Sequence, residues 1–203
     1  MGTLAGSRNC PRAGRGFTML ELMLVMALVA IILAMGAPAF RDFRLNSRLT
    51  GLTNDFVTAV QAARTEAIKR QAVVTLCRST QPSSADAACD GSSFEGWIVF
   101  ADGDGNCARG SGEPVLRSGG TPDAAVFAPA NFSCLPFATT GFLRAVAGQP
   151  LPGHLIFCDA RGLGAQGGTS ASAAHGIIVS ESGRASVTRD AALMGAWSLA
   201  CSG

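Results

Sequence analysis

The stretch GFTMLELMLVMALVAIILAMGAPAF, from Gly16 to Phe40, decides how the rest of this chain is organised. It holds no charged side chain from Leu22 onward. A helix over these residues, at about 1.5 Å of rise per residue, crosses most of a hydrocarbon core about 30 Å thick. The sequence therefore predicts a transmembrane helix over residues 17–40.

Basic residues precede this stretch. Arg8, Arg12 and Arg15 lie within the first 16 residues, which contain no acid. Positive charge beside a membrane span favours the cytoplasmic side. We therefore expect residues 1–16 to be a leader that stays in the cytoplasm, and the remainder of the chain to be exported.

One acid, Glu21, interrupts the apolar stretch near its start. A carboxylate at membrane depth is costly unless a partner neutralises it, so such a residue marks function by default. The spacing of Gly16, Phe17 and Glu21 resembles the type IV prepilin signature. That resemblance implies that a prepilin peptidase cleaves between Gly16 and Phe17 and methylates the new N-terminus. It also implies that Glu21 neutralises the N-terminal ammonium of a neighbouring subunit.

An ordinary signal peptide or signal anchor is the alternative interpretation of this N-terminal region. A secretory signal has a short apolar core followed by a cleavage site with small residues. Here Gly16 precedes the apolar run instead, which favours the prepilin interpretation.

Beyond Phe40 the apolar residues form a stripe at spacings of three or four: Leu45, Leu49, Leu52, Phe56, Val60, Ala63 and Ala67. This period is typical of a helix with one buried face. We predict an amphipathic helix over residues 41–71 that continues the transmembrane helix, so that one nearly continuous helix runs from about Phe17 to Arg70.

The remainder, residues 72–203, has the sequence pattern of a β domain. Short runs rich in branched and aromatic residues alternate with Gly, Pro, Ser and Asp, a pattern that predicts strands. The runs are AVVTLC (72–77), GWIVF (96–100), PVLR (114–117), GFLRA (141–145), HLIFC (154–158), GIIVS (176–180) and ASVTR (185–189). We interpret the Gly- and Ser-rich residues 162–174 as a loop. The fold class is then α+β, with the long helix packed on one or two antiparallel sheets.

Several blocks of this region resemble the GspH/FimT family of minor pilins and pseudopilins, and FimT most of all. They are ARTEAIKRQAVVTLC (63–77), EGWIVFADGDGN (95–106), EPVLR (113–117), TGFLR (140–144), FCDARG (157–162) and IIVSESGR (177–184). The resemblance implies a type IV pilin-like fold in a single-pass inner-membrane protein with a periplasmic domain. It implies a minor type IV pilin that assists pilus assembly and has other pilins and the prepilin peptidase as partners. A GspH-type minor pseudopilin of type II secretion is the alternative.

Six cysteines remain once the leader, which contains Cys10, is set aside: Cys77, Cys89, Cys107, Cys134, Cys158 and Cys201. An even number in an exported domain predicts up to three disulfides. We favour Cys77 with Cys89, because they bracket one short polar loop. Zinc binding is the competing interpretation, and the sequence holds no C-x-x-C pair or Cys/His cluster to favour it.

A basic element near the C-terminus, SGRASVTRD, contains Arg184 and Arg189. Proteins that resemble FimT can bind DNA through a Gly-Arg-x-Arg element at this place. Ser186 stands here where the second arginine would be, so the resemblance is incomplete. Arg144 and Arg161 are candidates to add charge to the same surface, and the alternative is a hairpin with solvated arginines.

Oxygen-bearing side chains in DGDGNCARGSGE have the spacing of a calcium loop: Asp102, Asp104, Asn106 and Glu113 fall at its first, third, fifth and twelfth positions. Two features disfavour calcium. Cys107 occupies the position where the sharp turn requires glycine, and the flanks are predicted strands rather than helices. A long hairpin connection would use the same residue types.

Charge and catalytic residues exclude other classes of function. Of 16 basic side chains three lie in the leader, which leaves 13 against 14 acids, so no global basic field attracts nucleic acid. His154 and His175 lie in no recognisable nucleophile motif. We therefore expect no enzymatic activity and no cofactor.

Overall fold

The computed structural model describes residues 16–91, 96–120 and 126–201, except for the side chains of residues 35–39. The predicted leader lies outside these residues apart from Gly16. The chain divides into two compact units, residues 1–43 and residues 44–203, and each is described by itself.

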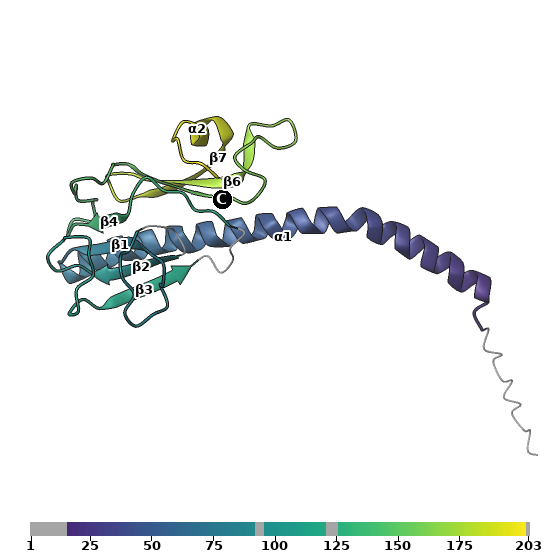
Figure 1. Ribbon diagram of the computed structural model, residues 1–203, viewed down its shortest axis with the longest axis horizontal. Coiled ribbons are helices and arrows are strands. Elements are labelled where there is room, and N and C mark those ends of the chain that lie inside the picture. Colours follow the sequence, from purple (N-terminus) through teal and green to yellow (C-terminus); the bar gives the residue numbers. More distant parts are fainter. Residues whose placement is uncertain (1–15, 92–95, 121–125, 202–203) are drawn as a thin grey trace, which may run out of the picture. The chain divides into compact units, whose positions relative to one another are not determined.

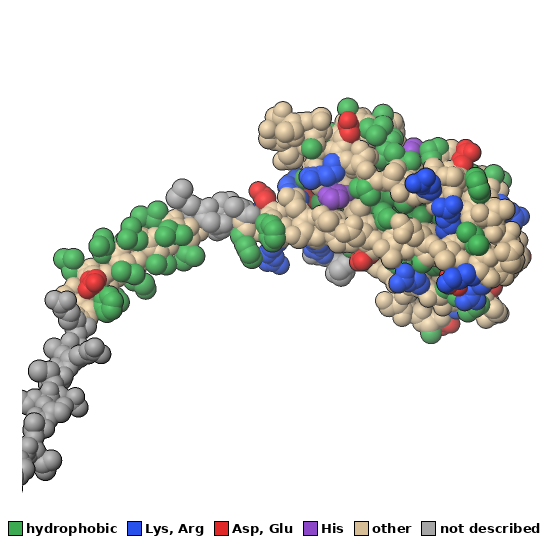
Figure 2. Space-filling view, turned by 180° about the vertical axis from the view of Figure 1, so that it is seen from behind, with side chains coloured by type: hydrophobic (Ala, Val, Ile, Leu, Met, Phe, Trp, Pro, Cys, Tyr) green, Lys and Arg blue, Asp and Glu red, His purple; other side chains and the backbone are tan. Residues whose placement is uncertain are grey.

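The first unit contains the beginning of helix α1, which extends from Met19 to Arg70 (Figure 1). This agrees with the helix predicted from the period of apolar residues. Its side chains from residue 17 to residue 34 are all exposed, among them Leu20 at 76%, Ile32 at 69% and Leu33 at 66%. In Figure 2 hydrophobic side chains cover the visible face of this segment, with a single acidic side chain among them.

Among the described residues, no helix combines the length and the apolar character needed to cross a membrane. The predicted transmembrane helix, residues 17–40, includes side chains 35–39, which lie outside the described part. The membrane span therefore stays a prediction.

The described residues of the second unit form seven strands in two antiparallel sheets. The first sheet has the order β3-β2-β1-β4 and the second has the order β5-β6-β7. Their bounds are β1 Val74–Ser79, β2 Gly96–Ala101, β3 Val115–Gly120, β4 Cys134–Phe137, β5 Gly153–Phe157, β6 Ala171–Val179 and β7 Ala185–Asp190, and a short helix α2, Ala191–Gly195, follows. The predicted fold class, α+β with antiparallel sheets, is confirmed.

Two details of the predicted strands are wrong. Residues 141–145 form no strand, because Gly141 has a φ of +79° and closes a turn in which its N–H donates to the Ala138 carbonyl. Leu143 contributes only an isolated bridge to Phe137. The strand of this region is instead β4, which contains Pro136 and lies at an edge of its sheet, where a missing N–H is tolerated.

The Gly- and Ser-rich segment is also shorter than predicted, since β6 begins at Ala171. A bulge between Ala171 and Gly176 lets the strand keep its pairing with β7 through these small residues. Residues 171–174 have the composition of a loop, but they belong to a strand because β6 pairs with β7 on both sides of the bulge.

The core forms where the apolar stripe of α1 meets both sheets. Seven apolar residues of the described helix are buried at 9% exposure or less: Leu49, Leu52, Phe56, Ala59, Val60, Ala63 and Ala67. The Phe56 ring lies 6.2 Å from that of Phe157 and 6.5 Å from that of Phe132. Burying one such ring contributes about 1.5–3 kcal/mol of transfer free energy. The amphipathic half of α1 is therefore the common support of both sheets.

Three disulfides pair the six cysteines. They are Cys77–Cys89, Cys107–Cys134 and Cys158–Cys201. The favoured pair, Cys77 with Cys89, is confirmed, and so is the prediction of up to three bridges.

The third disulfide holds the C-terminal segment on the second sheet. The buried Met194 of α2 and the partly buried Trp197 pack with Ile156 and Cys158. A Cβ at Gly176 would lie 2.8 Å from atoms of both Met194 and Trp197, so only glycine allows this close packing. The tail thus covers sheet residues that would otherwise be exposed.

Candidate functional site

The predicted processing and assembly residues lie at the start of α1. The Thr18 hydroxyl accepts a hydrogen bond of 3.2 Å from the Glu21 N–H, which is the geometry of an N-terminal helix cap. Glu21 lies in the first turn, where the positive end of the helix dipole stabilises a carboxylate. Within residues 16–91, 96–120 and 126–201, no basic side chain pairs with Glu21. The Thr-x-x-Glu pattern was a local signal for this helix start that the sequence analysis did not use.

The two arginines of the basic element lie at opposite ends of β7. Arg184 is exposed in the turn before this strand, where its carbonyl accepts from the Ser180 N–H. The Arg189 guanidinium donates from Nε and Nη2 to the Ser172 carbonyl at 3.0 and 2.8 Å. Five residues of strand span about 16 Å, so Arg184 and Arg189 do not form one compact patch.

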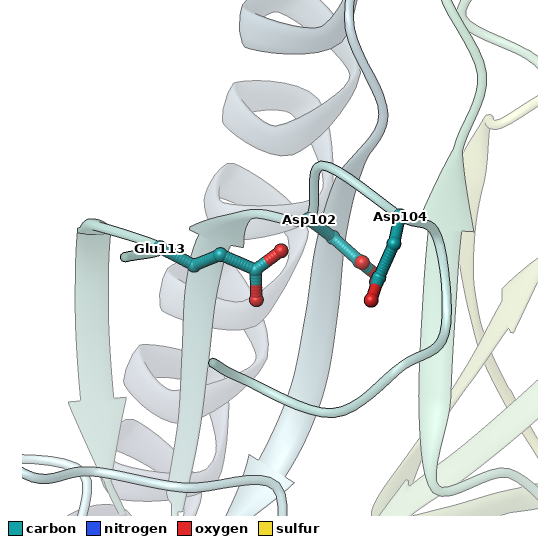
Figure 3. Close-up of side chains that lie close together, drawn as sticks. All are labelled: Asp102, Asp104 and Glu113. Atoms are coloured by element: carbon teal, nitrogen blue, oxygen red, sulfur yellow. The ribbon is translucent and has the colours of Figure 1, made fainter. Parts of the chain in front are cut away.

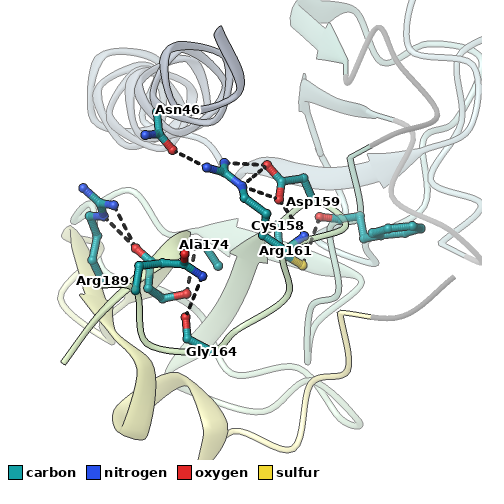
Figure 4. Close-up of polar contacts among 10 residues, drawn as sticks. Asn46, Cys158, Asp159, Arg161, Gly164, Ala174 and Arg189 are labelled. Carbon is teal, nitrogen blue, oxygen red and sulfur yellow. Dashed lines mark hydrogen bonds and ion pairs between the residues drawn. The ribbon is translucent and has the colours of Figure 1, made fainter. Parts of the chain in front are cut away.

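Arg161 is held in a structural contact (Figure 4). Its guanidinium binds the buried Asp159 carboxylate, with a closest distance of 2.6 Å, and donates to Asn46 Oδ1 on α1 at 2.9 Å. Burial alone raises the pKa of Asp159, but the hydrogen bonds and charge of Arg161 outweigh burial and leave this pKa below its ordinary value. Arg161 therefore fixes the segment after β5 on the helix.

Arg144 also lies elsewhere. Its guanidinium lies against Gly105, where it leaves no room for a Cβ. It therefore contacts the loop that contains the predicted calcium ligands. Figure 2 accordingly shows Lys and Arg side chains scattered over the globular unit, with hydrophobic side chains between them, rather than one basic stripe.

The loop between β2 and β3 gathers the predicted calcium ligands. The ligand oxygens of Asp102, Asp104 and Glu113 lie within 4.8 Å of one another (Figure 3). The fourth predicted ligand, Asn106, donates from Nδ2 to Asp104 Oδ2 at 2.6 Å. Cys107 adopts the left-handed region with φ +64°, at the position where the calcium loop requires glycine.

Asp102 is the fully buried centre of this loop. Its carboxylate accepts from the Thr75 hydroxyl and the Gly105 N–H at 2.7 Å, and from the N–H groups of Asn106 and Cys107 at 3.1 Å. Glu113 accepts from the Gly103 and Gly110 N–H groups, each at 2.7 Å. These carboxylates therefore take the backbone donors of the loop as partners, and the side chains that resemble metal ligands already order the connection.

The two histidines are packed into the second sheet rather than into a catalytic constellation. The His154 ring stacks on Trp197 at 4.4 Å, and its Nδ1 contacts Asn131 at 3.3 Å. Burial, together with the charges of Arg189 and Arg161, lowers the pKa of the nearly buried His175. Among the described residues neither ring has a hydrogen bond to a Ser or Cys nucleophile. The absence of enzymatic activity stays a prediction.

Replacing Asp102 by alanine is expected to lower the free energy of unfolding by about 2–4 kcal/mol, because buried donors lose their acceptor. Asp104→Ala is the matched control, since Asp104 is exposed and its described bonds go only to Asn106. Denaturant unfolding, followed by near-ultraviolet circular dichroism, measures both variants. Equal stabilities would contradict the role of Asp102.

Calcium binding is tested separately, because the carboxylates have partners of their own. If the loop holds the ion, calcium raises the melting temperature of the wild type, since a ligand of the native state must stabilise it. Asp104→Ala, which removes a predicted ligand, then abolishes that shift. A melting temperature that calcium leaves unchanged rules out this loop as a calcium site.

Comparison with known proteins places this architecture in a family. A model of the family described as type II transport protein GspH matches residues 52–183. A model of the prokaryotic N-terminal methylation motif matches residues 11–37. The crystal structure of type IV minor pilin FimU from Pseudomonas aeruginosa aligns with 72% of this chain and 92% of its own, at 18% identity and a TM-score of 0.48.

Curated relatives match a shorter part of the chain. Prepilin peptidase-dependent protein D of Escherichia coli is 40% identical over 55 residues, which are 26% of this chain and 38% of that protein. The type IV major alpha-pilin of Moraxella bovis is 39% identical over 54 residues, which are 25% of this chain and 34% of that protein. The chain thus spans about a third of the length of the curated relatives it matches. Because the GspH match extends over more than half of the chain, from the buried stripe of α1 to the turn before β7, the chain belongs to the GspH family.

Proposed function

We propose that this protein is a minor type IV pilin of the FimT kind, cleaved after Gly16 and incorporated into a periplasmic filament. The observation that carries the proposal is the start of α1, where an exposed apolar surface bears a single acid. Phe17 is 77% exposed, and Glu21 follows it in the first turn. A helix that is apolar all round requires either lipid or other helices as its surroundings.

Assembly in this proposal is an exchange of surroundings for the first part of α1. Residues 17–40 leave the lipid of the inner membrane and pack against the same segments of neighbouring pilins. Cleavage exposes an ammonium group at Phe17, and Glu21 of the adjacent subunit pairs with it. The pairing of the Glu21 carboxylate with the ammonium group is strong because little water screens it. It fixes how far one subunit is shifted along the next, because any other position leaves a charge unpaired among apolar side chains.

A minor pseudopilin of type II secretion is the second candidate. The description of the matched family as type II transport protein favours it, and the same helix and sheets serve a short periplasmic filament equally well. Deleting the gene separates the two candidates. Loss of surface pili with normal secretion of exported enzymes supports the pilus, and the reverse result supports the pseudopilus.

DNA contact is a further part of the FimT-like proposal. The exposed Arg184 supports it, because no ion pair within the described residues occupies its guanidinium. Arg189 contributes less, since two of its donors bind the Ser172 carbonyl. One or two phosphate contacts bind weakly and depend on salt, so several subunits in a filament must act together.

Mass spectrometry of the protein extracted from membranes tests the processing step. The expected mature chain begins at an N-methylated Phe17, because the residues that precede it are the leader. A chain that retains residues 1–16 in cells with an active prepilin peptidase would contradict the proposal.

Glu21→Ala is expected to reduce incorporation into filaments at least tenfold, because the ammonium group of the neighbour then lacks its partner. Asp42→Ala is the matched control, as it removes another exposed acid from the same helix. Immunoblots of sheared filaments, normalised to the amount of protein in the membrane, measure the effect. Equal incorporation of both variants would overturn the pairing.

A further inference from the structure

Three segments that are distant in sequence meet near the end of α1: residues 64–68 of the helix, the turn 138–142 and the turn 180–184. A Cβ at Gly141 would lie 2.8 Å from Ile68 Cδ1 and 3.0 Å from Arg64 Nε. A Cβ at Gly183 would collide with the Gly141 carbonyl. Both glycines have positive φ, so the two turns approach the helix and each other through bare backbone.

Hydrogen bonds fix these turns to each other. The Leu143 N–H donates to the Glu181 carbonyl at 2.8 Å, and the Ala138 N–H donates to the Phe142 carbonyl at 2.8 Å. Phe142 therefore lies between Gly141, which contacts α1, and Leu143, which binds the turn 180–184. The backbone that carries its ring is ordered.

The side chains that this arrangement presents are aromatic and basic. Phe142 is 53% exposed although its neighbours Gly141 and Leu143 are buried. Arg64 is partly exposed as a residue, although its Nε atom is itself buried without a hydrogen-bond partner. Arg184 is exposed in the adjacent turn. One acid, Glu181, is exposed in the same turn and reduces the net positive charge.

We propose that Arg64, Phe142 and Arg184 form a binding surface for single-stranded nucleic acid. The ring of Phe142 stacks on an unpaired base, and the two guanidinium groups bind flanking phosphates. An exposed ring with arginines on the two neighbouring segments fits a single strand better than a duplex, because duplex bases already stack on one another. The inference rests on the DNA contact proposed above. It adds that the bound nucleic acid is single-stranded and that Arg64 and Phe142, which lie outside the basic element, take part in binding.

Fluorescence anisotropy with the full chain in nonionic detergent tests the proposal, using a labelled oligothymidylate of about 20 nucleotides and a duplex of equal length. The wild type is expected to bind the single strand more tightly than the duplex. Phe142→Leu weakens single-strand binding about 5- to 100-fold, the range found when a stacking aromatic is removed, and leaves duplex binding unchanged. Phe142→Tyr keeps the ring and the affinity.

The arginines are tested by the salt dependence of binding. Two phosphate contacts give a slope of log K against log salt near −1.4 on a single strand, and Arg184→Ala or Arg64→Gln each reduces its magnitude by about 0.7. Arg117→Ala is the matched control, because Arg117 is an exposed arginine on strand β3, at the edge of the first sheet opposite to β4. It is expected to leave the slope unchanged.

The outcomes distinguish this inference from the proposed DNA contact. If the wild type binds neither oligonucleotide in about 50 mM salt, where phosphate contacts are strongest, both fail. If it binds both equally and Phe142→Leu binds like the wild type, the stacking surface is overturned and the DNA contact stands. If anionic phosphatidylglycerol vesicles displace the single strand from the wild type and lose affinity for Phe142→Leu, the surface is a lipid contact and the inference is also overturned.

Discussion

The buried stripe of α1 is the constraint on which the rest of the second unit depends. Residues from Leu49 to Ala67 present one apolar face to two sheets, and Phe56 touches the rings of Phe132 and Phe157. Among the described residues, neither sheet has a second helix of comparable length to cover it. Strand pairing satisfies the backbone, but burial against this helix supplies the apolar contacts that hold two small sheets as one unit.

The same helix changes character along its length. Its first part, residues 17–34, is exposed and apolar apart from Glu21, while its second part is buried along one face and polar elsewhere. The first pattern requires lipid or other helices around it, which the described residues do not supply. The second pattern supports the loops and turns of the second unit. In the proposed function, filament assembly would therefore use the first part of α1, and nucleic-acid contact would use turns that the second part supports.

Several polar residues of the second unit have hydrogen-bond partners that their sequence motifs do not indicate. Asp102, Asp104 and Glu113 have the spacing of calcium ligands, yet their oxygens accept hydrogen bonds from the loop. Arg161, a candidate for nucleic-acid contact, is bound to Asp159 and Asn46. The spacing of residues in a motif indicates which side chains could share one ligand. Their actual hydrogen-bond partners depend on which donors lie nearby once the loop has folded. Arg64 belongs to no motif, so its partial exposure and its buried Nε without a hydrogen-bond partner become visible only in the folded unit.

The sequence by itself determined the helix from about Phe17 to Arg70, the α+β class and the pair Cys77–Cys89, because periodicity and short separations are local properties. It placed most strands correctly but missed β4, where Pro136 disguises an edge strand. Only the tertiary structure decided the partners of Cys107 and Cys158 and the meeting of Arg64 with the turns at Gly141 and Gly183. These contacts join residues far apart in the chain, and they are selected by how the sheets pack on the helix rather than by any local preference of the backbone.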